Sequence, residues 1–113
     1  MMERRKHPRI EALHPVLYYS NTYPSPKVAS TLDLSHGGAR IETRTSIRRR
    51  EGLDISIAIQ PRVIQCRGKV MYVVDSEGER MRAGIRFEDL SEDDSLSLGQ
   101  YLSYMTAQQA QIA

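Results

Sequence analysis

The sequence predicts a mainly β domain, a six-stranded antiparallel β-barrel with a C-terminal α-helix and a flexible basic N-terminal arm. Three observations lead to this fold class. Apolar and polar residues alternate along successive short segments, as they do in half-buried strands. Turn-forming residues separate these segments, and the last segment changes to helical spacing. The length of 113 residues suits one domain with one modest core.

Six segments have the composition and period of strands. The alternation is cleanest where Leu53, Ile55, Ile57 and Ile59 point one way and the residues between them point the other. Gly68 interrupts the longest segment, which predicts a β-bulge or a sharp bend. Short strands separated by turns are typical of a small closed or nearly closed barrel. The expected strands are residues 16–20, 27–35, 39–44, 53–60, 62–74 and 80–88.

The last element is predicted to be an amphipathic helix over about residues 91–106. Ser91, with Asp94 three residues later, resembles an N-terminal capping pattern. The apolar residues of this segment recur at i, i+3, i+4 and i+7, namely Leu98, Tyr101, Leu102 and Met105. Residues 107–113 are expected to fray. We expect the chain to divide into a flexible arm, residues 1–10, and one barrel domain with its helix, residues 11–113.

The net charge of +2 is small, so the local distribution of charge is more informative than the total. Basic residues cluster at Arg4–Arg9 and at Arg48–Arg50, which indicates a localised anionic partner. The second cluster has the composition of a solvated loop. No stretch approaches the roughly 18 consecutive apolar residues of a membrane span, and we expect a cytoplasmic protein. The single cysteine, Cys66, excludes an intramolecular disulfide.

The sequence offers no catalytic set and no metal site. His7, His14 and His36 lack metal-ligand spacing, and no second cysteine supports a zinc site. Asp33, Ser35 and His36 are nearly adjacent, but successive strand residues project to opposite faces, so adjacency is no evidence for a triad. We therefore expect a binding protein rather than an enzyme.

The segment from Asp33 to Gly38 has the chemistry of a binding surface. Asp33 and Ser35 lie two residues apart and are expected to project in parallel from a strand. A carboxylate accepts two N–H bonds from the N1 and N2 edge of guanine, and a serine hydroxyl donates or accepts. Gly37 and Gly38 allow a tight turn and a close approach of a ligand to the backbone. The same residue types are also common turn formers, so this segment alone is weak evidence.

The N-terminal arm carries four cations, Arg4, Arg5, Lys6 and Arg9. Guanidinium groups bind phosphate oxygens in a two-pronged fork, bind the O6 and N7 edge of guanine, and stack on flat purines. One arm can therefore neutralise phosphates and hold bases together. From charge alone, the alternative is a solvated basic tail.

Two motifs in this order resemble the PilZ domain family. "RKHPR" fits R-x-x-x-R, and "DLSHGG" fits D-x-S-x-x-G. The later segments "GKVMYV", "AGIRFEDL" and "LGQYL" are also similar to the family, so the resemblance covers nearly the whole chain. It implies a six-stranded barrel that binds the bacterial second messenger cyclic di-GMP and needs no other cofactor. By matching positions, Arg5 and Arg9 would bind phosphates and guanine edges, and Asp33, Ser35 and Gly38 would hold a guanine.

The resemblance implies further details of the site. Arg4 extends the motif to R-R-x-x-x-R, which in this family goes with two stacked, intercalated ligand molecules per chain. Tyr72 stands where the family often has tryptophan, and its ring either stacks on a base or packs on the barrel surface. Ligand binding is expected to order the arm, because several charge-assisted hydrogen bonds outweigh the entropy of fixing a short segment. An unidentified downstream protein would then bind the new surface of a monomeric chain.

Two other functions stay open. A PilZ-like chain without ligand would be a protein-interaction adaptor, but the intact motif residues argue against that loss. A small nucleic-acid-binding barrel would use the arm and Arg48–Arg50 on phosphates. Aromatic residues make up only 6% of the chain and tryptophan is absent, which disfavours a base-stacking platform for nucleic acid.

Overall fold

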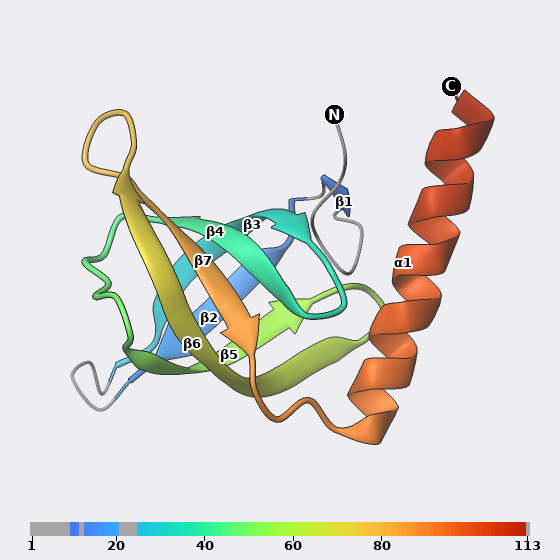
Figure 1. Cartoon of the computed structure of the whole chain (residues 1–113), viewed down its shortest axis with the longest axis horizontal. Coiled ribbons are helices and arrows are strands. Elements are labelled where there is room, and N and C mark those ends of the chain that lie inside the picture. Colours follow the sequence, from blue (N-terminus) through green and yellow to red (C-terminus); the bar gives the residue numbers. More distant parts are fainter. Residues whose placement is uncertain (1–9, 12, 21–24, 113) are drawn as a thin grey trace.

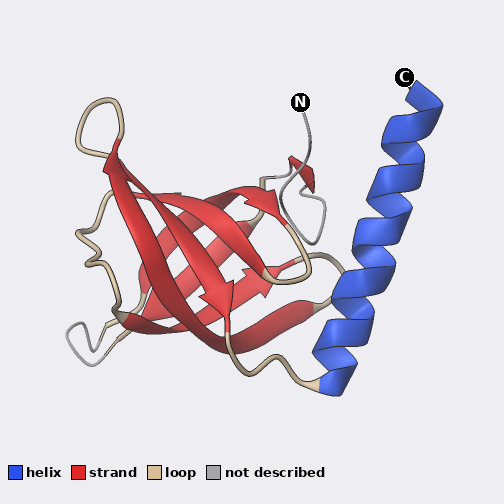
Figure 2. Ribbon diagram, viewed as in Figure 1, coloured by secondary structure: helices blue, strands red, loops and turns tan. Residues whose placement is uncertain are grey.

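The computed structural model describes residues 10–11, 13–20 and 25–112. These residues form seven strands and one helix (Figure 1 and Figure 2). The elements in chain order are β1 (Ile10–Glu11), β2 (Pro15–Tyr19), β3 (Lys27–Leu34), β4 (Gly38–Thr43), β5 (Gly52–Ala58), β6 (Val63–Asp75), β7 (Met81–Phe87) and α1 (Glu92–Ile112).

Six of the strands close into an antiparallel barrel, which confirms the predicted fold class. Hydrogen-bonded neighbours follow the order β3-β2-β5-β6-β7-β4, and the pairing of β4 with β3 completes the circle. All six strands have ends within two residues of the predicted ones. The short β1 was not predicted as a strand: Ile10, which the sequence analysis placed in the arm, pairs with Leu34 of β3.

The barrel encloses one contiguous apolar core. Leu53, Ile55, Ile57 and Ile59 of β5 and the turn after it are all buried, as their alternation predicts. Each fully buried isoleucine stabilises the fold by about 1.5–3 kcal/mol. Tyr18 is also fully buried, and its hydroxyl shares a 2.8 Å hydrogen bond with the Thr43 hydroxyl, as a buried polar group requires.

The long strand β6 contains a bulge, but not at the glycine where the sequence analysis expected it. The pairing of β6 with β7 shifts register between Val70 and Tyr72, whereas Gly68 keeps its regular pairing. A Cβ atom at position 68 would approach the Ile85 side chain to 2.6 Å. Glycine at position 68 therefore leaves room for the Ile85 side chain inside the barrel.

The helix α1 begins where predicted and ends later. The Ser91 hydroxyl accepts the backbone N–H of Asp94 at 3.1 Å, and three acidic residues in the first turn complement the helix dipole. Leu98 is fully buried against the barrel. The helix ends at Ile112 rather than near 106, because residues 107–112 are mostly alanine and glutamine, which tolerate a helix well. The described residues contain one helix, and it is not apolar over a stretch long enough to cross a membrane.

A histidine at the start of β2 holds α1 against the barrel. The Tyr101 hydroxyl lies 2.8 Å from Nε2 of His14, and the two rings meet edge to face with centroids 5.3 Å apart. Burial lowers the pKa of His14, partly opposed by a hydrogen bond to the backbone of Ala58, and burial raises the pKa of Tyr101. Neutral His14 therefore accepts the Tyr101 O–H, because a protonated imidazole only donates.

Acidification below neutral pH should destabilise the fold through His14. The unfolded chain protonates His14 near its ordinary pKa, whereas the folded chain holds that pKa lower. The unfolded state then binds more protons, so the stability that neutral His14 contributes is present above about pH 6.5 and is lost as the pH falls. Urea unfolding of the wild type and of His14→Gln between pH 7.5 and about pH 5 measures the effect. The variant should show the flatter pH profile, and parallel profiles would contradict the assignment.

The thiol of Cys66 should be unreactive in the folded protein. Burial, followed by the nearby carboxylates of Asp89 and Asp94, raises the pKa of Cys66 to about 12. These two carboxylates are fixed in place, since they accept the backbone N–H groups of Arg67 at 2.6 Å and Gln65 at 3.1 Å. Iodoacetamide at pH 8 should alkylate the native chain far more slowly than the urea-unfolded chain, because the thiolate is the reacting form. Equal rates in the two states, measured by intact mass, would rule this out.

Candidate functional site

The predicted binding turn joins β3 to β4. The backbone N–H of Ser35 donates to the carbonyl of Gly38 at 2.8 Å, and the Ser35 hydroxyl donates to the same carbonyl at 3.2 Å. The backbone N–H of Phe87 donates to the carbonyl of Gly37 at 2.9 Å, which ties the turn to the end of β7. The turn is therefore fixed by the fold, and Ser35 is buried within it rather than open on the barrel wall.

Gly38 is required by barrel closure. It pairs with Arg86 of β7, and a Cβ atom at this position would overlap the carbonyl oxygen of Ile85. The sequence analysis attributed the two glycines to the turn and to the approach of a ligand. The structure gives Gly38 a further reason, because only glycine allows β4 to approach β7 this closely.

Asp33 is joined to Arg40 across the β3–β4 pair. The register shifts between Thr31 and Asp33, and Asp33 then stands opposite Arg40. The Arg40 Nε donates to Oδ2 of Asp33 at 2.6 Å, and the aspartate is only 5% exposed. From the sequence alone the part of Arg40 is uncertain, because its alignment with Asp33 depends on whether the turn preserves register. Its position two residues after Gly38 was the available indication.

The same row of residues continues to Tyr72. Arg40 stands opposite Gly84 of β7, and Gly84 stands opposite Tyr72 of β6. Directly opposed residues project from the same face of a sheet, here the outer face, because Ala39 and Ile41 on either side of Arg40 are buried in the core. A Cβ atom at Gly84 would overlap the Tyr72 ring, so the ring lies over β7, 37% exposed. Packing on the barrel surface is thus established for Tyr72, and the exposed part of its ring remains open to a ligand.

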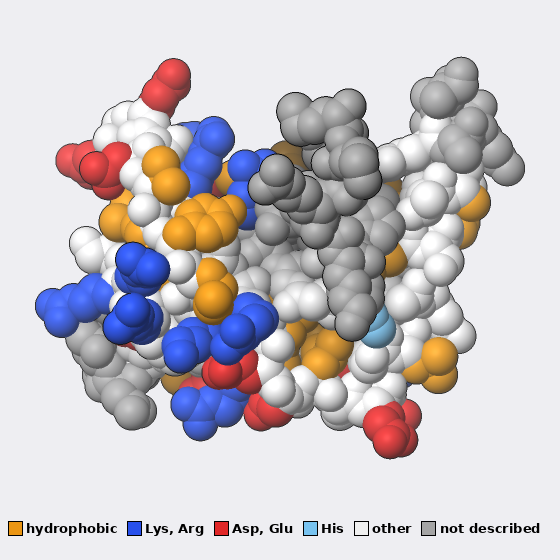
Figure 3. Space-filling model, viewed as in Figure 1, with side chains coloured by type: hydrophobic (Ala, Val, Ile, Leu, Met, Phe, Trp, Pro, Cys, Tyr) orange, Lys and Arg blue, Asp and Glu red, His pale blue; other side chains and the backbone are white. Residues whose placement is uncertain are grey.

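The neighbouring row on this outer face is basic. Lys69 of β6 stands opposite Arg86 of β7, which in turn stands opposite Gly38. The guanidinium of Arg86 reaches the carboxylate of Glu88 at 3.5 Å, a weak pair because both groups are exposed. Figure 3 shows lysine and arginine side chains gathered around apolar ones on this side of the barrel. The surface next to the turn is therefore suited to an anionic ligand.

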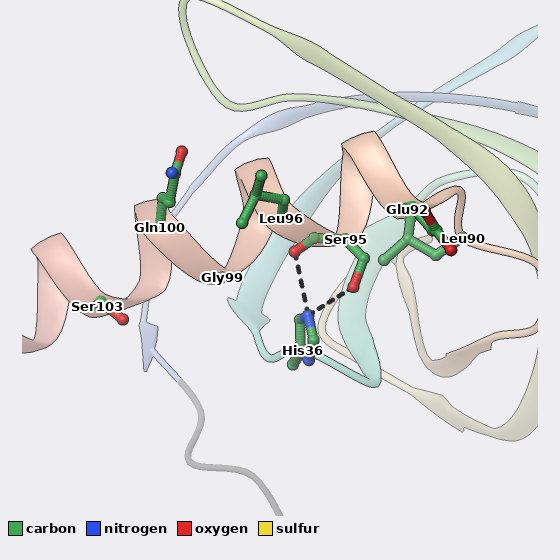
Figure 4. A pocket seen from close by; sticks show the side chains of 8 residues that line it. All are labelled: His36, Leu90, Glu92, Ser95, Leu96, Gly99, Gln100 and Ser103. Atoms are coloured by element: carbon green, nitrogen blue, oxygen red, sulfur yellow. Dashed lines mark hydrogen bonds between the residues drawn. The ribbon is translucent and has the colours of Figure 1, made fainter.

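A groove on the other side of the turn has a different character. It lies between the turn and α1, and His36, Leu96 and Gln100 are among its lining residues (Figure 4). The His36 Nε2 lies 3.1 Å from the carbonyl oxygen and 3.0 Å from the hydroxyl of Ser95, so the turn is joined to the helix. Among the described residues that line it, one is formally charged, Glu92, and none is a lysine or arginine.

The arm residues Arg4, Arg5 and Arg9 lie outside the described residues. The register of β1 is described: Ile10, the residue after Arg9, pairs with Leu34, and Glu11 pairs with Asp33. Along the described part of the chain, no group of three histidine, cysteine, aspartate or glutamate side chains is placed to hold a metal ion. The structure thus brings together Asp33, Ser35 and the two glycines, and it places Tyr72 in the same row as Asp33, three strands away.

Solved structures with the same fold include proteins from three bacteria. The first is the Bacillus subtilis inhibitor of motility MotI/DgrA, with 19% identity and a TM-score of 0.80; the match covers 97% of this chain and 53% of that one. The second is Escherichia coli YcgR in complex with c-di-GMP, with 17% identity and a TM-score of 0.80; the match covers 96% of this chain and 49% of that one. The third is the K. pneumonia MrkH–c-di-GMP complex, with 15% identity and a TM-score of 0.82; the match covers 99% of this chain and 57% of that one. This chain spans about half the length of each, and such low identities show the fold alone.

Comparison with curated sequences gives no match. The family model of the PilZ domain, in contrast, matches residues 3–104, which include both motifs, all the strands and most of α1. This chain belongs to the PilZ domain family.

Proposed function

We propose that this chain is a receptor for cyclic di-GMP. PilZ domains are receptors or adaptors for this messenger rather than enzymes, and the names of two structural neighbours, YcgR and MrkH, record c-di-GMP complexes. The observation that carries the proposal is the register of β1. It sets Ile10, the residue that follows the R-x-x-x-R motif, beside Leu34 of the D-x-S-x-x-G motif.

The two motifs would hold complementary parts of the ligand. The guanidinium groups of Arg5 and Arg9 bind the two phosphates and guanine edges, while the Asp33 carboxylate accepts N–H groups of a guanine. Each charge-assisted hydrogen bond contributes about 1.5–3 kcal/mol. Several of them exceed the cost of about 1–2 kcal/mol for fixing each backbone residue of a short arm. Ligand binding therefore orders the arm over the barrel, and a downstream protein binds the surface that results.

Two ligand molecules per chain are the proposed stoichiometry. A second dinucleotide brings two further phosphates, and Arg4 supplies an additional guanidinium to offset them. The basic row of Lys69 and Arg86 adds positive potential on the same side as the turn. The receptor itself acts as a cytoplasmic monomer.

Loss of either arm arginine should weaken the binding of cyclic di-GMP at least tenfold. Arg5→Ala and Arg9→Ala each remove a contact of about 1.4 kcal/mol or more, without touching the barrel core. Isothermal titration calorimetry of the full chain measures the affinity.

Arg49→Ala is the matched control, because Arg49 is an exposed arginine of the β4–β5 loop outside both motifs. Its affinity should equal that of the wild type. If all three variants bind as the wild type does, the arm is not part of the site. If the wild type gives no heat with the messenger and binds oligonucleotides instead, the receptor proposal fails.

Arg4→Ala should lower the stoichiometry from two ligands per chain towards one. The remaining Arg5 and Arg9 still bind the first dinucleotide, whereas the second loses the cation that offsets its phosphates. The molar ratio at saturation in calorimetry gives the result directly. One ligand per wild-type chain would refute the two-ligand arrangement and leave the receptor proposal intact.

A further inference from the structure

Among the described residues, the Arg40 guanidinium forms a hydrogen bond through Nε alone. Its Nε donates to Oδ2 of Asp33 at 2.6 Å, although a guanidinium has five N–H donors. Among the described residues, Asp33 is the only polar partner of Arg40. The arginine side chain is 37% exposed, against 6% for the aspartate. The pair therefore presents the two Nη groups of Arg40 on the outer face, beside a largely covered carboxylate.

An aromatic ring lies in the same row of the outer face as Arg40. The next residue in the row is Gly84, which has no side chain, and beyond it the Tyr72 ring lies across β7. A flat ligand placed here would meet donors at Arg40 and an aromatic ring at Tyr72, next to the largely covered carboxylate of Asp33. Strand pairing aligns Asp33, Arg40 and Tyr72 in one row that crosses β3, β4, β7 and β6.

The geometry points to Arg40 as a specificity-determining residue that donates to O6 of the guanine held by Asp33, an inference that rests on the proposed function. The Watson–Crick edge of guanine offers two donors, N1–H and N2–H, next to one acceptor, O6. A carboxylate beside a guanidinium has the complementary order. Adenine reverses this order at both positions, with a donor at N6 and an acceptor at N1. Arg40 and Asp33 together therefore select guanine over adenine.

If the Asp33–Arg40 ion pair only stabilises the fold, its loss should lower the affinity for all cyclic dinucleotides by one common factor. If Arg40 contacts O6, its loss should change the ratio of the affinities for two ligands that differ at that atom. This ratio of affinities is therefore the quantity to measure, and the folding stability of each variant is measured separately.

The test compares cyclic di-GMP with its 6-thioguanine analogue, in which sulfur, a weak acceptor, replaces O6 while N1–H and N2–H remain. The wild type should prefer cyclic di-GMP about tenfold, the loss expected for one charge-assisted hydrogen bond. Arg40→Lys keeps the positive charge beside Asp33 but lacks the planar fork whose Nη groups extend beyond the Nε that donates to Asp33. It should reduce the preference to about twofold or less. Preference over the inosine analogue, which lacks only the N2 amino group, should persist in the variant because Asp33 is unchanged.

Arg82→Lys is the matched control. Arg82 also donates through Nε to a cross-strand carboxylate, Glu42 at 3.0 Å, and it is similarly exposed on the next row of the outer face. Its ligand preference should equal that of the wild type.

Three results overturn the inference and are distinguishable. If the wild type does not bind cyclic di-GMP, the proposed function fails and the role of Arg40 fails with it. If the wild type binds both ligands equally, no donor contacts O6, a result that needs no variant and stands even if Arg40→Lys misfolds. If Arg40→Lys weakens both ligands by the same factor, Arg40 is only a structural partner of Asp33.

Discussion

Closure of the sheet between β3, β4 and β7 is the constraint on which the rest of this structure depends. A six-stranded sheet has no free edge only if β4 pairs on both sides, and the pairing with β7 is possible because position 38 carries no side chain. The same hairpin sets Asp33 opposite Arg40 and fixes the turn that carries Ser35. The arrangement of the motif residues is therefore set by the way the barrel closes.

The helix is joined to the barrel at two points that lie at different ends of the site. His14 accepts the Tyr101 hydroxyl close to the junction of β1 and β2, and His36 of the turn contacts Ser95. The segment before β2 and the β3–β4 turn are thus both in contact with α1. Leu96 and Tyr104 of the same helix are exposed.

The fold was largely predictable because each strand buries one face against a single core. The alternation at Leu53 to Ile59 and the switch to helical spacing after Ser91 contain that information locally. The bulge between Val70 and Tyr72 and the late end of α1 were missed, because they depend on strand pairing and on weak helix propensity. Of the site, the motif residues were found by type and spacing. The Asp33–Arg40 pair was not, since one shifted register decides which residues face each other.

The Tyr72 ring resting over Gly84 has a consequence for how this surface changes over evolutionary time. Any side chain at position 84 would displace the ring, and a small residue at position 72 would expose the bare backbone of β7. The two positions are consequently expected to vary together among related sequences, with bulk on one strand compensated by its absence on the next. Substitutions that alter ligand preference at positions 72 and 84 would then occur in pairs rather than singly.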